Sequence, residues 1–237
     1  MKPVAAAVIA LLAALPAAVQ AQARECRVPA DLPRAHVEGP TAEEPMRQMP
    51  IARYTLAVSW SPHYCRPRAG RPTPDSFQCS GDFGFTLHGL WPDGVGQTWP
   101  QYCQPAALVP DRVVRETLCA TPDVQLIQHE YAKHGTCMGV SPAAYFSRST
   151  ALYRDLRFPD MARLARRTQT VRSVTRAFAA ANPGMRADML RLNLDRQGWL
   201  SEVWICLDTA FKREKCPAGG PRQTTKVRIR PAVPAAA

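Results

Sequence analysis

The sequence lacks several features that would have indicated common classes of protein. Beyond residue 23 it has no long hydrophobic run, so no transmembrane helix is predicted there. Its eight cysteines include no Cys-x-x-Cys pair, which argues against a structural zinc site. It also contains no internal repeat. Residues 24–237 are instead long enough for one domain with a substantial core.

Acidic side chains are scarce relative to basic ones. The chain has 19 Asp and Glu residues against 30 Lys and Arg residues, which gives a formal net charge of +11. This balance predicts attraction to polyanions, chiefly nucleic acids or anionic surfaces. Arginine dominates the basic residues, and genome composition also favours arginine, so charge alone does not identify the partner.

The first 23 residues have the layout of a secretory signal peptide. Met1-Lys2 provides a positive start, the apolar run Pro3–Val19 follows, and Ala21-Gln22-Ala23 suits a signal peptidase. The run is interrupted by Pro16 and is short for the alternative, a retained membrane anchor. We expect cleavage after Ala21 or Ala23 and export of a soluble mature protein, residues 24–237.

An even number of cysteines in an exported chain predicts disulfides. All eight cysteines lie after the signal peptide, and the bacterial periplasm or the exterior would allow four bridges to form. Spacing alone does not determine how they are connected. The cysteines are Cys26, Cys65, Cys79, Cys103, Cys119, Cys137, Cys206 and Cys216.

The order of the expected elements is typical of an α+β fold with an antiparallel sheet. Alternating strand formers predict strands at 53–60 and 83–87, the second followed by His88, and a hairpin within 189–207. The other segments are expected to be irregular. They are an extended arm at 24–50 that is tied down at Cys26, loops at 62–81 and 92–110, and a basic tail after Pro217 that is loose at its end.

Four helices are expected in the middle of the chain. Pro110-Asp111 begins the first of them. Thr121 as N-cap, with Pro122 at the first helical position, begins the second, which stops at Gly135. Ser141-Pro142 begins the third. The expected helices cover residues 110–118, 121–135, 141–153 and 170–181.

Two short runs, Phe85–Pro92 and His129–Cys137, hold three of the five histidines. Imidazole can both accept and give a proton near neutral pH. Because a helix turns about 100° per residue, four functional side chains of the second run share one broad face and can converge on one group. They are His129, Glu130, Lys133 and His134.

The second run is close to the zinc-protease pattern His-Glu-x-x-His, but it does not match it. That pattern needs histidines four residues apart, and here Lys133 stands four residues after His129 while His134 stands five. One metal held by both histidines would need a distorted helix and would lie beside an ammonium group. The run therefore favours acid–base chemistry on an anionic group, and solvated helix residues are the alternative.

Other histidines and tryptophans lack such a pattern. His36 and His63 stand alone in segments that resemble loops, so we expect both on the surface. Trp60, Trp199 and Trp204 alternate with polar residues in strand-like runs, so we expect all three in the core.

The two histidine runs resemble the paired active-site segments of the ribonuclease T2 family. Members of this family are exported endoribonucleases with little base specificity. His88–Pro92 matches the first segment and His129–Cys137 the second, with Tyr131 where tryptophan is commoner. The resemblance extends from Tyr54 to Cys216. Two further matching runs are Trp60–Cys65 and Glu202–Asp208.

The resemblance implies the α+β fold of that family and cleavage of RNA by its own 2′-hydroxyl group. His134 would be the general base and His88 the general acid. Lys133 and Glu130 would stabilise charge on the phosphoryl oxygens, and His129 would bind the phosphate. The product would be a 2′,3′-cyclic phosphate. No metal or cofactor is needed, and DNA would not be cleaved because it lacks the 2′-hydroxyl group.

The matching positions also suggest contacts with the bases. Trp91 would stack on a base, and Asp93 and Trp99 would belong to a base pocket. The implied disulfides are Cys103–Cys137, Cys206–Cys216 and Cys65–Cys79, with Cys26–Cys119 left by exclusion. We expect a monomer that acts on RNA and makes no membrane contact after signal cleavage. An exported cationic protein that binds RNA without cleaving it is the alternative.

Overall fold

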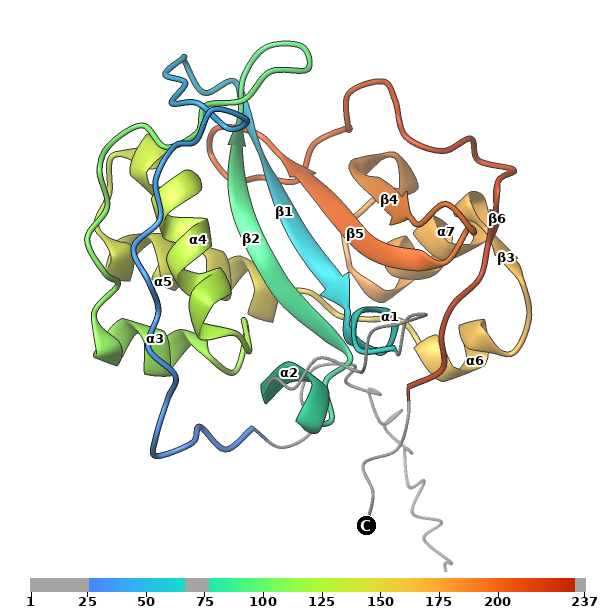
Figure 1. Cartoon of the computed structure of the whole chain (residues 1–237). Coiled ribbons are helices and arrows are strands. Elements are labelled where there is room, and N and C mark those ends of the chain that lie inside the picture. The colour runs from blue at the N-terminus through green and yellow to red at the C-terminus, as the bar shows by residue number, and fades with distance from the viewer. Residues whose placement is uncertain (1–25, 67–76, 233–237) are drawn as a thin grey trace, which may run out of the picture.

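The structure, a computed structural model, describes residues 26–66 and 77–232. At its centre is the antiparallel sheet expected of an α+β fold, with the strand order β2-β1-β5-β4 (Figure 1). Two of its strands come from the first half of the chain and two from the second half. The four strands are β1 (Arg53–Trp60), β2 (Phe85–Asp93), β4 (Leu190–Leu194) and β5 (Leu200–Leu207).

Helices flank the two ends of this sheet. Three of them, α3 (Asp111–Thr117), α4 (Val124–Lys133) and α5 (Pro142–Arg154), lie on the β2 side in Figure 1. On the β4 side lie α6 (Met161–Ala165) and α7 (Val171–Ala181). The smaller elements are α1 (Ser61–Tyr64), α2 (Phe77–Ser80), the 3₁₀ turns η1 (Gly135–Met138) and η2 (Ala187–Met189), and the paired strands β3 (Gln169–Thr170) and β6 (Lys226–Val227).

Because side chains alternate along the strands, the sheet has two different faces. One face packs into the hydrophobic core, and we call the opposite face, which carries Thr55 and Ser59, the site face. On β1, Leu56, Val58 and Trp60 are buried at 1%, 0% and 2% exposure and join the hydrophobic core. Side chains between them, such as Thr55 and Ser59, point to the other face. The helices α5 and α7 pack against this sheet. The site face is thus left to carry polar groups.

The second strand extends further along the chain than the sequence predicts. A β-bulge interrupts the alternation of its side chains, so the sequence pattern does not show that the strand continues. Gly89 pairs with Ala57 and Leu87 pairs with Val58, so His88 has no partner on β1. The extra residue lets both Leu87 and Leu90 enter the core, at 1% and 0% exposure. The expected strand at 83–87 is therefore wrong at both ends, and His88 lies within the strand rather than after it.

The helix α4 begins two residues later than predicted. Asp123, not Thr121, is its N-cap, and the Asp123 carboxylate accepts a hydrogen bond from Leu126 N at 2.9 Å. The Thr121 hydroxyl instead donates to Leu87 O at 2.9 Å. The helix ends at Lys133, and η1 follows directly in place of the expected continuation to Gly135.

Other expected elements are confirmed. The N-cap Ser141 accepts a hydrogen bond from Ala144 N, and Pro142 is the first residue of α5. Thr170 is the N-cap of α7, and β4 and β5 form the expected hairpin. Within the basic tail, β6 pairs with β3 and Ile229 is 3% exposed, and the end of the tail, residues 233–237, lies outside the described residues. The expected signal peptide, residues 1–23, lies outside the described residues.

The expectations for His63 and Trp199 are wrong. His63 is 4% exposed, because β1 passes directly into α1 and turns this side chain inward, 3.7 Å from the Asp195 carboxylate. Trp199 is only half-buried and is covered by the guanidinium groups of Arg228 and Arg230. His36 is exposed and Trp60 is in the core, both as expected.

The N-terminal arm, residues 26–50, runs along α3 and α4 (Figure 1). The backbone of His36 and the side chain of Gln125 exchange hydrogen bonds, and Arg47 forms a bridge with Gln101.

Across the described ranges, no helix is long and apolar enough to cross a membrane. The four disulfides have the implied pairing: Cys26–Cys119, Cys65–Cys79, Cys103–Cys137 and Cys206–Cys216.

Candidate active site

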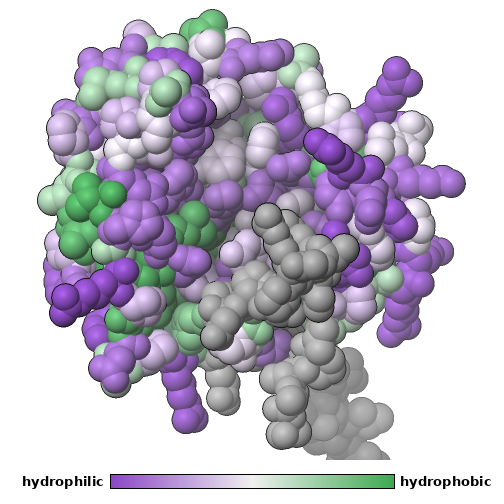
Figure 2. Space-filling view, in the orientation of Figure 1, coloured by the Kyte–Doolittle hydropathy of each residue, from purple (hydrophilic) through white to green (hydrophobic). Residues whose placement is uncertain are grey.

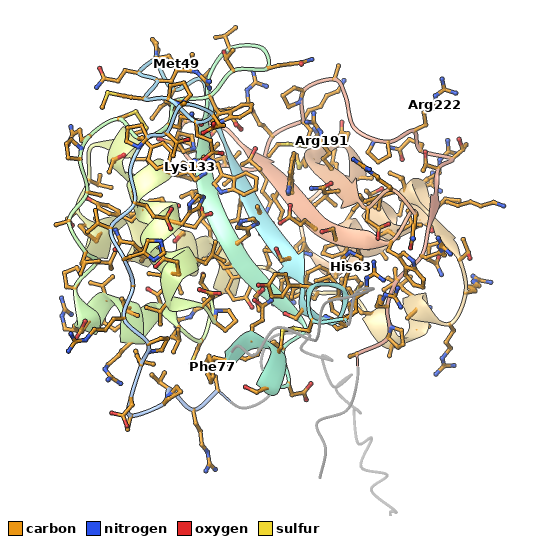
Figure 3. The ribbon with its side chains drawn as sticks, viewed as in Figure 1. Met49, His63, Phe77, Lys133, Arg191 and Arg222 are labelled. Atoms are coloured by element: carbon orange, nitrogen blue, oxygen red, sulfur yellow. A yellow bond between two sulfur atoms is a disulfide. The ribbon has the colours of Figure 1, made fainter. Side chains whose placement is uncertain are left out.

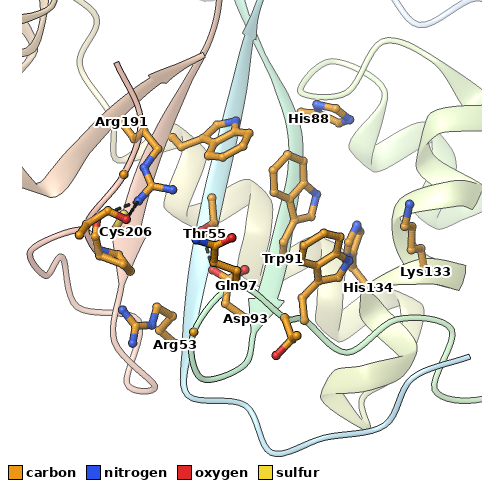
Figure 4. Close-up of a pocket in the computed structure, with 18 of the residues that line it drawn as sticks. Arg53, Thr55, His88, Trp91, Asp93, Gln97, Lys133, His134, Arg191 and Cys206 are labelled. Atoms are coloured by element: carbon orange, nitrogen blue, oxygen red, sulfur yellow. Dashed lines mark hydrogen bonds between the residues drawn. The ribbon is translucent and has the colours of Figure 1, made fainter. Parts of the chain in front are cut away.

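A cavity of about 650 Å³ lies on the site face of the sheet. Its walls come from β1, β2, β4 and β5, from the end of α4, from residues 96–99 and from residues 217–220 (Figure 4). The structure brings together every side chain that the sequence proposed for catalysis and substrate binding. They are His88, Trp91, Asp93, Trp99, His129, Glu130, Lys133 and His134.

On the sheet side, His88 is held by the carboxylate of Glu202 from β5. The His88 Nδ1 atom lies 2.5 Å from Glu202 Oε1. Glu202 is only 8% exposed, and it is itself fixed by three neighbours. It accepts hydrogen bonds from Trp204 Nε1 at 2.8 Å, Ser59 Oγ at 2.9 Å and Asn193 Nδ2 at 3.2 Å. The orientation of His88 is therefore determined by a hydrogen-bond network that spans all four strands of the central sheet.

This network separates the pKa values of its two titratable groups. Burial would raise the pKa of Glu202, but its hydrogen bonds, first that from His88, outweigh burial and lower the pKa to about 2. Burial would also lower the pKa of His88. The bond to Glu202 and the charge of Glu130 outweigh that effect, so the pKa of His88 is raised. The surroundings favour His88 in its protonated form.

On the helix side, His134 follows the last residue of α4 and is 7% exposed. Burial lowers the pKa of His134 well below its ordinary value, and the positive charges of Lys133, His129 and His88 lower it further. Its buried Nδ1 atom has no hydrogen-bond partner within the described part of the chain. These surroundings favour His134 in its neutral form.

Trp91 lies between the two histidines (Figure 4). Its ring centroid is 5.0 Å from that of His88, 5.6 Å from that of His134 and 5.5 Å from that of Trp204. Trp204 was expected in the core, which is wrong. Its neighbours Val203 and Ile205 take the core positions on β5, and Trp204 points to the cavity.

Glu130 links the sheet to the helix. It is 1% exposed, accepts a hydrogen bond from Trp91 Nε1 at 2.8 Å, and lies 3.5 Å from His88 Nε2. Burial raises the pKa of Glu130, and the charges of His88 and His129 and the hydrogen bond from Trp91 oppose this rise. Gly89 makes this position possible, because a Cβ atom there would overlap the Glu130 carboxylate and lie 2.7 Å from Trp91 Nε1.

Two carboxylates from the N-terminal arm also reach the site, and no sequence pattern indicated them. Glu38 Oε2 lies 2.6 Å from His129 Nδ1, and Glu44 Oε1 lies 2.6 Å from Lys133 Nζ. The hydrogen bond from Lys133 lowers the pKa of Glu44. These contacts join residues 91 and 89 positions apart, so no local motif could have revealed them.

The far end of the cavity combines a carboxyl group with two arginines. Asp93 accepts a hydrogen bond from Thr55 Oγ1 at 2.6 Å, and burial raises the pKa of Asp93. Arg53 and Arg191, which the sequence had not singled out, line this end (Figure 4). Trp99 stands at the rim with 43% of its surface exposed, so its ring is available for stacking.

His129 on α4 and His134 directly after it hold their rings at a wide angle to each other. The ring centroids of His129 and His134 are 6.5 Å apart, with an angle of 78° between the ring planes. Over residues 26–66 and 77–232, no group of three or more His, Cys, Asp or Glu side chains is arranged to hold a metal ion.

The antiparallel sheet with flanking helices and four disulfides is a ribonuclease T2-like fold, as comparison with solved structures shows. The RNase-related protein from Calystegia sepium superimposes with a TM-score of 0.62 at 20% identity, covering 77% of this chain and 98% of that one. The S-like ribonuclease trichomaglin gives a TM-score of 0.60 at 21% identity, covering 78% and 100%.

Sequence comparison gives the same family. The chain belongs to the ribonuclease T2 family, whose sequence profile matches residues 52–216. A ribonuclease of Aeromonas hydrophila is 32% identical over 161 residues, covering 65% of this chain and 71% of that protein. A probable ribonuclease of Haemophilus influenzae is 29% identical over 181 residues, or 70% of this chain. The matched region spans 61% of the length of that Haemophilus protein.

Proposed function

We propose that this protein is an endoribonuclease that cleaves single-stranded RNA, with little base specificity and without a metal ion. The observation that carries the proposal is the contrast between its two central histidines. The surroundings of His88 raise its pKa, and those of His134 lower its pKa, while both rings contact Trp91. An acid and a base are therefore available together at one pH.

The reaction would be a transphosphorylation. His134 takes the proton of the ribose 2′-hydroxyl, and the 2′-oxygen attacks the adjacent phosphorus. The bond from phosphorus to the 5′-oxygen breaks, and His88 gives its proton to that leaving oxygen. The products are a 2′,3′-cyclic phosphate and a free 5′-hydroxyl group. Deoxyribose lacks the attacking group, so DNA is not a substrate.

Three more side chains would act on the phosphate. Lys133 supplies positive charge to the developing oxyanion, and protonated Glu130 donates a hydrogen bond to it. His129, oriented by Glu38 at 2.6 Å, binds the phosphate before the reaction. Trp91 and Trp99 offer aromatic faces, and Asp93 with its neighbours forms the base pocket. Aromatic stacking tolerates every base, which suits low base specificity.

The same reasoning gives the setting of the protein. Four disulfides stabilise the chain, and such bonds persist in oxidising compartments. We therefore propose that it is a single catalytic domain at 24–237 that is exported to the periplasm or the exterior after cleavage of the signal peptide at 1–23. It would act there as a monomer on RNA, away from the membrane.

The test is incubation of the mature protein with single-stranded RNA in excess EDTA, beside the His134→Ala variant and a DNA substrate of the same sequence. The wild-type protein should release fragments with 2′,3′-cyclic phosphate ends, detectable by ³¹P NMR. Because general base catalysis contributes about 10²- to 10⁴-fold, the variant should be slower by that factor. Intact RNA with the wild-type protein, or equal cleavage by His134→Ala, would refute the proposal.

A further inference from the structure

A second concave surface, separate from the catalytic cavity, is lined by arginines. It is a depression of about 520 Å³ formed by α6, α7 and the segment between them. Four guanidinium groups line it, and no acidic side chain does. The arginines are Arg163, Arg166, Arg167 and Arg176, all exposed.

These arginines lack carboxylate partners, unlike some other arginines on the surface. Arg112 pairs with Glu116 at 2.9 Å, and Arg213 pairs with Asp155 at 2.5 Å. None of the four arginines in the depression makes an ion pair with any residue that the structure describes. Uncompensated guanidinium groups in a concave surface attract anions, and their planar form matches phosphate oxygens.

A basic segment connects the depression to the catalytic cavity. Pro217 to Gly220 line the cavity, where Arg191 donates a hydrogen bond to Pro217 O at 2.7 Å. A few residues later, Gln223 O accepts from Arg172 N at 3.0 Å, at the start of α7. Arg222 lies between these contacts and points outward (Figure 3). Arg172 is one helical turn from Arg176 in the depression.

The two chain segments that form this route carry no acidic residue. Residues 161–181 and 217–230 together contain nine Lys and Arg residues and no Asp or Glu. Hydrophilic side chains project from this side of the molecule, which carries α6 and β6 (Figures 1 and 2). We call the surface formed by residues 161–181 and 217–230 the basic track.

We propose that the basic track binds the phosphodiester backbone of single-stranded RNA outside the catalytic cavity, so that long RNA is the preferred substrate. This inference rests on the proposed function, because the strand would leave the cavity along residues 217–225. A lipid surface fits the track less well. A membrane-bound helix inserts apolar side chains, and the large hydrophobic side chains that are exposed in the described structure all lie elsewhere on the molecule.

The test compares two variants that lose the same charge. The track variant is R163Q/R166Q/R167Q/R176Q, and the control is R27Q/R34Q/R112Q/R154Q, whose positions are exposed and outside the track. On polyuridylate the track variant should raise KM about tenfold, while kcat/KM on a dinucleoside monophosphate stays unchanged. Each lost phosphate contact should also reduce the salt dependence of binding, by about 0.7 in the log–log slope.

Other results would overturn the basic track as a binding site for RNA. They are an equal rise in KM for the control variant, an equal loss on the dinucleoside monophosphate, or no change at all. Loss of binding to phosphatidylglycerol vesicles with unchanged binding to polyuridylate would assign the surface to membranes instead. A wild-type protein that cleaves neither substrate refutes the proposed function alone, since fluorescence anisotropy with labelled polyuridylate still tests the track.

Discussion

The sheet side and the helix side of the site place the same chemical group in opposite surroundings. His88 lies on a strand bulge with the Glu202 carboxylate 2.5 Å away. His134 lies at the end of a helix, buried, with the positive charges of Lys133 and His129 nearby. One imidazole is therefore stabilised as a cation and the other as a neutral base. The difference shows how one fold can hold an acid and a base made from one residue type.

The order of the two pKa values matters as much as their separation. Burial lowers the pKa of His134 and carboxylates raise that of His88, so the active protonation state dominates at every pH between the two values. Activity should fall below the pKa of His134, where the base becomes protonated. It should also fall above the pKa of His88, where the acid loses its proton. Variants that weaken either environment should narrow this range.

The largest loss of activity is expected from Gly89→Ala, because this substitution disturbs the sheet side and the helix side of the site at once. The new methyl group would overlap the Glu130 carboxylate and crowd Trp91, the ring between the two histidines. We expect kcat/KM on RNA to fall about 10³-fold, within the range of acid–base contributions. Overpacking should also lower the free energy of unfolding by about 1–3 kcal/mol, measured by denaturant titration.

Gly39→Ala provides the matched control for this substitution. No atom lies within 4 Å of a Cβ atom placed at Gly39, so that variant should keep wild-type activity and stability. A Gly89→Ala protein with normal kcat/KM would show that the contact between the β2 bulge and Glu130 is dispensable.

A smaller loss of activity is expected from Glu202→Gln, which changes only the sheet side of the site. An amide cannot stabilise the imidazolium ion as a carboxylate does, so burial would then dominate and the pKa of His88 would fall. We expect kcat to drop about 10- to 100-fold. The alkaline side of the pH–rate profile should move to lower pH, because His88 would lose its proton earlier.

The shift in the profile distinguishes positioning of His88 from a purely structural role of Glu202. Glu116→Gln is a suitable control, because Glu116 is exposed on α3 and contacts only Arg112 among the ion pairs of the described residues. That variant should show the wild-type profile. A reduced kcat for Glu202→Gln with an unmoved alkaline limb would contradict the assignment of Glu202 to His88.

The sequence predicted the helix side of the site better than the sheet side. The residues on α4 follow one another in the chain, so helical geometry was enough to place His129 to Lys133 on one face. The sheet side depends on pairing between distant strands. Glu202 is 114 residues from His88, and the bulge that turns His88 toward the site is visible only in the register of β1 and β2.

The arm was the part of the site that sequence reasoning missed most completely. It has no regular structure, and the sequence predicted only an extended arm held at Cys26, with no role in the site. The Cys26–Cys119 disulfide and the bonds between His36 and Gln125 bring it to α4, and these are tertiary contacts without a local signal. As a result, Glu38 and Glu44 meet His129 and Lys133, the two side chains that are expected to act on the phosphate.

The smallest change in activity is expected from Glu44→Gln. This substitution makes the helix side of the site more positive and leaves the sheet side unchanged. Glu44 lies 2.6 Å from Lys133 Nζ and partly neutralises the ammonium that should attract the RNA phosphate. Removing this charge should lower KM for RNA, and because the Glu44 side chain is 44% exposed, the gain should stay under about fivefold. Since substrate binding would then depend on a freer cation, KM should also rise more steeply with salt.

Glu43→Gln separates this local effect from the change in net charge. Glu43 is the exposed neighbour of Glu44 in the arm, so both variants gain one positive charge. Steady-state kinetics on polyuridylate at several salt concentrations should show a lower KM for Glu44→Gln only. If both variants lower KM equally, the arm acts through general charge, and the direct pairing of Glu44 with Lys133 has no role in substrate binding. A higher KM for Glu44→Gln would mean that Glu44 positions Lys133 for the phosphate rather than competing with it.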